Sequence, residues 1–120
     1  MKLYDENNIF AKIIRKEIPA KIIYEDDTVI AIHDIAPAAP IHILVLTKKP
    51  YLSFNDFILK SDKSEIHEFF TIVQKIASDL GLESAGYRIL MNHGEDAMQS
   101  VPHFHIHILG GKKLGRLIGN

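Results

Sequence analysis

His103-Phe104-His105-Ile106-His107-Ile108, close to the C-terminal end of the chain, alternates imidazole side chains with apolar ones. Successive side chains of a β-strand point to opposite faces, so an extended backbone places the three histidines on one face. The other face is purely apolar and has the two-residue period of a strand packed on a core. We therefore predict a strand over 103–109 whose histidines face away from the core, into a cleft or solvent. Imidazole ionises near neutral pH, which suits it to nucleophilic, acid-base or metal-binding chemistry.

The composition predicts one globular domain over residues 1–120. The chain has 120 residues, of which 47% are hydrophobic and 24% are charged, which is enough for a single core. The net charge of −1 argues against a broad nucleic-acid surface, and no stretch approaches the ~20 apolar residues of a membrane span. Because the sequence has no cysteine and starts with no signal-like segment, we expect a cytoplasmic location.

Two helices are predicted from apolar periodicity. Asn8 is a candidate N-cap of a short helix that carries one apolar stripe and ends before Pro19. A longer amphipathic helix is expected over 63–80, with Asp62 at its start and Gly81 at its end.

Four further strands are predicted, at 22–25, 28–33, 41–47 and 87–92. The first two are separated by an acidic pair and are expected to form a hairpin. Hairpins with two helices, and without alternating β-α units, indicate an α+β fold with an antiparallel sheet covered on one face.

The remaining histidines are interpreted one by one. The alternation of 41–47 puts His42 on the same face as two leucines, which makes it a candidate fourth imidazole. His67 lies on the polar side of the long helix and His93 begins a loop, so both are interpreted as surface residues. His33 is interpreted as structural.

The motif and several segments before it resemble the histidine triad family, in particular its nucleotide-binding branch. The motif is followed by Leu109-Gly110-Gly111. The segments that match, in the right order, are Ile13-Ile14-Arg15-Lys16-Glu17-Ile18-Pro19-Ala20-Lys21, His33-Asp34-Ile35, Pro40-Ile41-His42 and Gln99-Ser100-Val101. The resemblance covers about residues 8–111. It implies a five-stranded antiparallel sheet with two helices, and a homodimer in which the two sheets are joined.

The resemblance also implies hydrolysis or transfer at the α-phosphorus of a nucleotide, here a purine nucleoside phosphoramidate derived from AMP or GMP. The middle histidine, His105, would be the nucleophile and carry a nucleotidyl intermediate that water releases. A neutral imidazole can divide one difficult displacement at phosphorus into two easier ones. A backbone carbonyl near His103 is expected to accept a hydrogen bond from the ring nitrogen of His105 that does not attack. His107 or Ser100 would assist the leaving group, and His42 would lie nearby. No cofactor is expected.

Nucleotide contacts are implied at three further places. Asp34, with Ile35 beside it, would bind the ribose, and Asn92 stands at the entrance of a phosphate loop over 94–100 that contains Met98, Gln99 and Ser100. The residues that would surround the base are Ile9, Phe10, Ile13, Ile18 and Ile32. From the residues alone, this apolar set also fits an ordinary core, and Asp34 fits a turn. Glycine is common in the family at the position of Met98, so a side chain there affects the loop's conformation and the leaving group's access.

Two other functions remain open at the level of sequence. Alternating histidines can bind zinc in hydrolases, although His103 and His107 would lie ~13 Å apart along a strand, which is awkward for one small coordination sphere. The other interpretation is a dimeric module that binds nucleotides or a protein partner without useful turnover.

Overall fold

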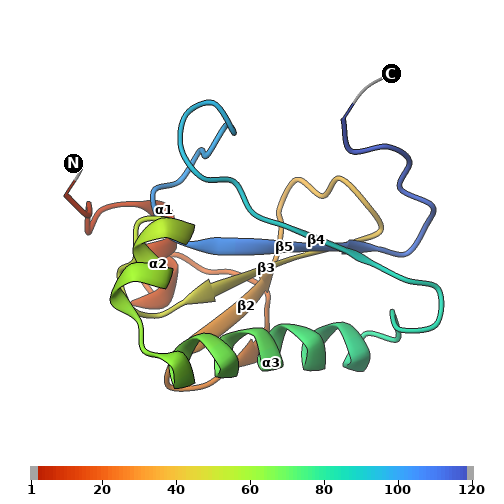
Figure 1. The fold of residues 1–120 in the computed structure, drawn as a ribbon, viewed down its shortest axis with the longest axis horizontal. Coiled ribbons are helices and arrows are strands. Elements are labelled where there is room, and N and C mark those ends of the chain that lie inside the picture. The colour runs from red at the N-terminus through yellow and green to blue at the C-terminus, as the bar shows by residue number, and fades with distance from the viewer. Residues whose placement is uncertain (1–2, 119–120) are drawn as a thin grey trace.

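A computed structural model of the chain describes residues 3–118 and confirms the antiparallel sheet (Figure 1). The strands are β1 (Ile22–Glu25), β2 (Val29–His33), β3 (Ile41–Thr47), β4 (Arg88–Leu90) and β5 (His105–Gly110). They form one five-stranded sheet in the order β1-β2-β3-β5-β4, in which every neighbouring pair is antiparallel. The two C-terminal strands are shorter than predicted, since β5 begins at His105 and β4 spans only Arg88–Leu90.

The two predicted helices are present as α1 (Ile9–Ile14) and α3 (Lys63–Asp79). The Asn8 side chain accepts a hydrogen bond from the backbone N–H of Ala11, at 2.9 Å, and so caps α1. Asp62 caps α3 in the same way by accepting from the N–H of Glu65, at 2.8 Å. Beyond α3, Gly81 takes the left-handed conformation, with φ of +76°. Side-chain caps satisfy backbone donors that have no partner within a helix, which explains where both helices start.

A third helix, α2 (Phe54–Lys60), was not predicted. Only Phe57 of this helix is buried, whereas Leu59 is 81% exposed, so the segment lacks the broad apolar stripe of a typical surface helix. Asp56 supports its first turn by accepting a hydrogen bond from the N–H of Leu52, at 2.7 Å.

The main core lies between the sheet and the pair of helices α2 and α3. Phe104 and Phe57 stack here with ring centroids 4.6 Å apart, and Phe69 packs against both rings. Figure 1 shows α3 running along this face of the sheet. The apolar side chains of the histidine motif, Phe104, Ile106 and Ile108, are at most 2% exposed and belong to this core, as predicted.

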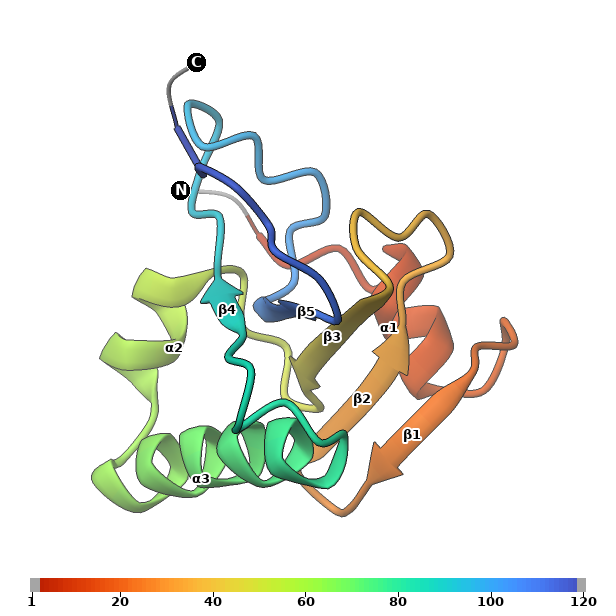
Figure 2. The ribbon, with the colours of Figure 1, turned by 90° about the vertical axis from the view of Figure 1, so that its right-hand side faces the viewer.

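The opposite face is covered as well, at one end, by α1, which corrects the expectation of a single covered face. Phe10 and Ile13 of α1 pack on the even-numbered residues of β2 and β3, namely Ile30, Ile32, Leu44 and Leu46. These two strands are apolar on both faces, so both faces have to be removed from water. In Figure 2, α1 lies on the side of β2 away from α3.

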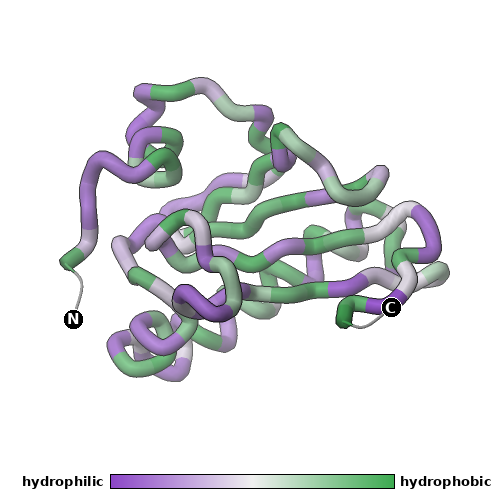
Figure 3. Tube along the Cα trace, turned by 90° about the horizontal axis from the view of Figure 1, so that it is seen from above, coloured by the Kyte–Doolittle hydropathy of each residue, from purple (hydrophilic) through white to green (hydrophobic). Residues whose placement is uncertain are grey.

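The helices carry hydrophilic as well as hydrophobic residues (Figure 3). Within residues 3–118, no helix has the length and apolar character that crossing a bilayer requires.

Candidate active site

The histidines of β3 and β5 meet on the face of the sheet that carries α1. In the antiparallel register His107 lies opposite Leu44, and His42 lies opposite Leu109. The ring of His107 is in the middle of a row, with its centroid 5.2 Å from that of His105 and 5.1 Å from that of His42. The structure therefore brings His42 into the group that alternation predicted. His67 and His93 are exposed, as expected of surface residues.

His105 is held as a neutral ring with one free nitrogen. Its Nδ1–H donates to the backbone carbonyl of His103 at 2.7 Å, which is the hydrogen bond that was expected there. The ring is 8% exposed, and Phe10 of α1 contacts it edge-on with the centroids 4.8 Å apart. Burial lowers the pKa of His105, partly offset by the bond to the carbonyl. Nε2 consequently keeps its lone pair at neutral pH.

His42 and His107 form a hydrogen-bonded pair whose protons can be assigned. The backbone N–H of Ala38 donates to Nδ1 of His42 at 3.0 Å, so the proton of this ring is on Nε2. That nitrogen lies 2.9 Å from Nδ1 of His107 and 3.4 Å from Oδ2 of Asp34. His42 thus donates to Nδ1 of His107, and the proton of His107 is on Nε2. Burial, followed by the neighbouring imidazoles, lowers the pKa of His107 to about 4.

His103 differs from the other two histidines of the motif. Its ring lies on the same face, 6.2 Å from that of Phe10, but it is 0% exposed, which corrects the expectation that all three rings face a cleft or solvent. Both ring nitrogens are bonded within the protein: Nε2 to the carbonyl of Thr47 and Nδ1 to the hydroxyl of Tyr4, each at 2.6 Å. Burial lowers the pKa of His103 to about 4. Its backbone carbonyl is the group that bonds to the ring of His105.

Asp34 and Ile35 follow β2 and are placed differently from each other. The side chain of Asp34 is 20% exposed, and its Oδ1 accepts from the N–H of Ala36 at 2.8 Å, which is the turn that its residue type favours. Its other oxygen, Oδ2, faces His42. Ile35 is 95% exposed.

The residues expected around the base divide into two groups. Phe10, Ile13 and Ile32 are at most 7% exposed and belong to the core beneath α1. Ile9 is 43% exposed and Ile18 is half-buried, so both keep surface available for a ligand. The first group therefore belongs to the core, and its contact with a base stays a prediction.

The expected phosphate loop is shaped by side chains that were predicted to contact the nucleotide. Gln99 accepts from the N–H of Gly94 at 2.9 Å and donates to the carbonyl of Leu52 at 2.8 Å, so both ends of its amide serve the loop. Asn92 donates to the carbonyl of Ala97 at 2.7 Å. Ser100 is exposed and lines a cavity of about 540 Å³ between this loop and the segment before α2.

Met98 is 84% exposed and has φ of +61°, in the left-handed region that favours glycine. The loop thus keeps a conformation suited to glycine although a methionine occupies the position. The N–H of Met98 bonds to the carbonyl of Glu95, at 2.9 Å, so this turn is closed by the backbone.

A metal-ligating arrangement is possible at a different set of residues from the one expected. The nitrogens of His103 are both occupied, which excludes this ring from a common coordination sphere in the observed arrangement. Asp34, His42 and His107 have ligand atoms within 4.8 Å of one another. A metal ion between the two rings would replace the proton that they share, and His105 is not part of this set.

Several residues of the site carry no local sequence signal. Tyr4, Ala38 and Thr47 decide the proton positions of His103 and His42, yet they belong to no recognisable motif. Tyr4 and Thr47 both bond to His103, from which they are 99 and 56 residues away in the sequence, so only the folded structure reveals these contacts.

Comparisons with known proteins agree with this architecture. A family model described as the HIT domain matches residues 15–114. An uncharacterized HIT-like protein of Rickettsia prowazekii is 50% identical over 118 residues, covering 98% of each chain. The purine nucleoside phosphoramidase of Escherichia coli K12 is 40% identical over 115 residues, covering 96% of each chain.

Two solved structures show the same fold. A histidine triad protein from Clostridium difficile has a TM-score of 0.84 at 41% identity, covering 95% of this chain and 98% of its own. A HIT family hydrolase from Clostridium thermocellum has a TM-score of 0.82 at 40% identity, with the same coverage. From its sequence, its fold and its row of histidines, the chain belongs to the HIT domain family.

Proposed function

We propose that the protein hydrolyses purine nucleoside phosphoramidates at the α-phosphorus, through a covalent nucleotidyl intermediate on His105. The observation that carries this proposal is the hydrogen bond from Nδ1–H of His105 to the carbonyl of His103, at 2.7 Å. This bond selects the tautomer whose Nε2 has a free lone pair, which is what attack on phosphorus requires. The name of the Escherichia coli relative supports the choice of a phosphoramidate as substrate.

In the first step a bond forms between Nε2 of His105 and the α-phosphorus, and the phosphorus–nitrogen bond breaks. The leaving nitrogen takes a proton from solvent, because a neutral imidazole that gave up its one N–H would become an anion. Nε2–H of His107, the nitrogen that the pairing with His42 leaves protonated, donates a hydrogen bond to the phosphoryl oxygens. The ring of His105 becomes positively charged, so its bond to the carbonyl of His103 becomes charge-assisted and stronger. This stabilises the intermediate more than the resting enzyme, as catalysis requires.

In the second step water attacks the phosphorus, and the bond to His105 breaks. One proton of the water is released to solvent, which returns the proton taken up in the first step, and the remaining hydroxyl stays on the phosphorus. The net reaction converts phosphoramidate and water into a nucleoside monophosphate and an amine. Ser100, which lines the cavity between the 94–100 loop and the segment before α2, would donate a hydrogen bond to the leaving group or phosphate.

Substrate binding is assigned to residues around the row of rings. Asp34 would accept hydrogen bonds from the ribose hydroxyls with Oδ2, the oxygen that faces His42. Ile9 and Ile18, which remain partly exposed, would contact the base, and Phe10 would support it from below. The loop before β5 would surround the phosphate with backbone amides.

A homodimer in the cytoplasm stays a prediction. The dimer is supported by β4, which is the last strand of the sheet and has a strand partner on only one side among the described residues. Ile89 of β4 is 44% exposed and Tyr87, just before it, is 37% exposed. Pairing through this edge would join two sheets and cover both side chains.

Mass spectrometry of a base-quenched reaction with adenosine 5′-phosphoramidate tests the proposal, because a phosphorus–nitrogen bond to histidine hydrolyses in acid. We expect an adenylyl group on the peptide that contains His105, and none with the His105→Asn variant, which should still bind AMP. Turnover by the pure variant, or turnover by the wild type without any adduct in rapid-quench samples, would contradict the covalent mechanism. Binding of AMP without turnover would instead support a binding module, and loss of activity with a chelator would support metal catalysis.

A further inference from the structure

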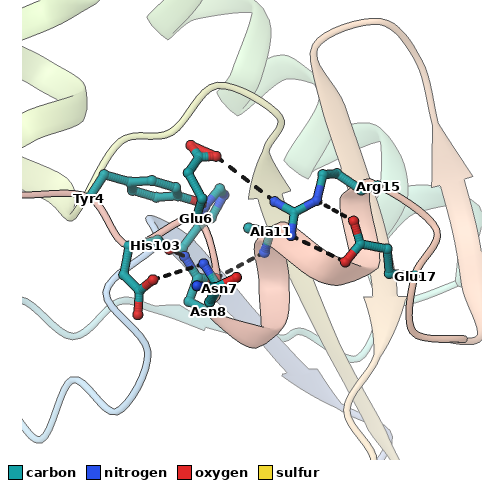
Figure 4. Close-up of polar contacts among 9 residues, drawn as sticks. Tyr4, Glu6, Asn7, Asn8, Ala11, Arg15, Glu17 and His103 are labelled. Atoms are coloured by element: carbon teal, nitrogen blue, oxygen red, sulfur yellow. Dashed lines mark hydrogen bonds and ion pairs between the residues drawn. The ribbon is translucent and has the colours of Figure 1, made fainter.

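Tyr4 reaches from the N-terminal segment to the buried ring of His103. Its hydroxyl oxygen lies 2.6 Å from Nδ1 of His103, across a separation of 99 residues in the sequence. The two rings also meet edge-on, with centroids 5.6 Å apart. Figure 4 shows Tyr4 and His103 beside the start of α1. Neither the histidine motif nor the proposed chemistry accounts for this contact.

The direction of this hydrogen bond follows from the other nitrogen of the ring. Nε2 of His103 lies 2.6 Å from the carbonyl oxygen of Thr47, and a carbonyl can only accept. Nε2 therefore carries the proton of the neutral ring, and Nδ1 is the acceptor. Tyr4 donates to it. Burial raises the pKa of Tyr4, so its hydroxyl remains a donor at neutral pH.

These two bonds fix the residue whose carbonyl orients the nucleophile. The backbone N–H of His103 bonds to the carbonyl of Val101 at 2.8 Å, and its carbonyl accepts from Nδ1 of His105 at 2.7 Å. The ring and the peptide of His103 are thus held at every polar atom by a partner in the protein. Rotation of the ring would break the bonds at both of its nitrogens, and these bonds anchor the residue whose carbonyl accepts from His105.

The N-terminal segment is itself anchored, so Tyr4 approaches His103 from a defined direction. Asn8 donates through its amide to the carbonyl of Asp5 at 2.8 Å while its oxygen caps α1. The N–H of Asn7 bonds to the Asp5 carboxylate, also at 2.8 Å. On the other side, Glu6 lies 3.9 Å from Arg15 of the segment that follows α1. Figure 4 shows these contacts around the start of α1.

We propose that Tyr4 is a positioning residue of the active site, which acts through His103 to hold His105 in the tautomer that leaves Nε2 free. The proposal rests on the proposed function for its effect on turnover, but its effect on the tautomers needs no substrate. Without the hydroxyl, Nδ1 of His103 becomes a buried acceptor with no partner. A buried polar group in that state is costly, so the ring is expected to rotate or to admit water.

The test compares Tyr4→Phe with Tyr24→Phe, which is a matched control. Tyr24 also donates a hydrogen bond at 2.6 Å, to Asp26, but it packs on the α3 side of the sheet, away from the histidines. Both substitutions remove one hydroxyl and keep the ring. We expect kcat of Tyr4→Phe to fall about tenfold, which is the worth of one hydrogen bond, with KM changed less than about twofold. The control should keep the kcat of the wild type.

Nitrogen NMR of the imidazole rings provides the readout that is independent of activity. In the wild type, His103 should show a single tautomer protonated at Nε2, and His105 a single tautomer protonated at Nδ1. In Tyr4→Phe we expect the His105 signals to shift toward a mixture of tautomers, whereas Tyr24→Phe should match the wild type. Unchanged tautomers, an unchanged kcat, or equal effects of the two substitutions would each overturn the proposal. If the wild type shows no turnover, the proposed function fails, and the tautomers alone decide on Tyr4.

Discussion

Acid should destabilise the protein through His103, because the fold buries this ring in its neutral form. The ring is 0% exposed, and burial lowers its pKa from 6.5 to about 4. Between these pH values the unfolded state binds a proton that the folded state does not, so the free energy of unfolding falls as the pH falls. At about 1.36 kcal/mol per pH unit, the full loss from this single ring is about 3 kcal/mol. The loss begins below about pH 6.5 and is complete only below the folded-state pKa of about 4.

Urea unfolding of the wild type and of His103→Gln, at equal protein concentration and at several pH values between about 7 and 4.5, measures this effect. Glutamine supplies a donor for Thr47 and an acceptor for Tyr4, but it does not titrate. His107 is present in both proteins, so the difference between the two pH profiles isolates His103. We expect the wild type to lose markedly more stability than the variant over this range.

Parallel pH profiles would refute the reasoning, because they would show that burial does not keep His103 neutral. A wild type that gains stability on acidification relative to His103→Gln would also refute it, since the folded-state pKa would then lie above that of the unfolded state.

Three further predictions concern other parts of the molecule. His42→Phe removes the donor to Nδ1 of His107, and with it the contact that keeps the proton of His107 on Nε2. Because a hydrogen bond to a charged group is worth about 1.5–3 kcal/mol, steady-state kcat should fall by at least about tenfold, and an unchanged kcat would separate His42 from the mechanism. Met98→Gly removes the strain of a left-handed non-glycine residue but increases the conformational entropy of the unfolded chain. The free energy of unfolding, measured with urea, should therefore stay the same or rise by up to about 1 kcal/mol, and a loss above about 1 kcal/mol would mean that the Met98 side chain stabilises the loop. Ile89→Arg on the exposed edge strand should convert the expected dimer to monomer in analytical ultracentrifugation, and a dimer that persists would place the interface elsewhere.

The strands and the two capped helices could be predicted because their signals are local. The alternation in 41–47 and 103–108 and the caps at Asn8 and Asp62 involve residues a few positions apart, and the structure has the elements that they predicted. Helix α2 was not predicted because it lacks such a local signal. It buries only Phe57, so no apolar stripe reveals it.

The face of β5 that carries the histidines could also be predicted, because a strand has a period of two residues. What each ring does depends on partners that come close only in the fold. Tyr4 and Thr47 bury and bond His103, whereas the N–H of Ala38 gives His42 the tautomer that pairs with His107.

Chemically identical imidazoles therefore differ in exposure and in proton position. Residue type and spacing determined that histidines line one face of the last strand. The three-dimensional contacts decided which ring is fully buried and which ring presents a free nitrogen, because burial and hydrogen bonding depend on distance in space and not on position in the chain.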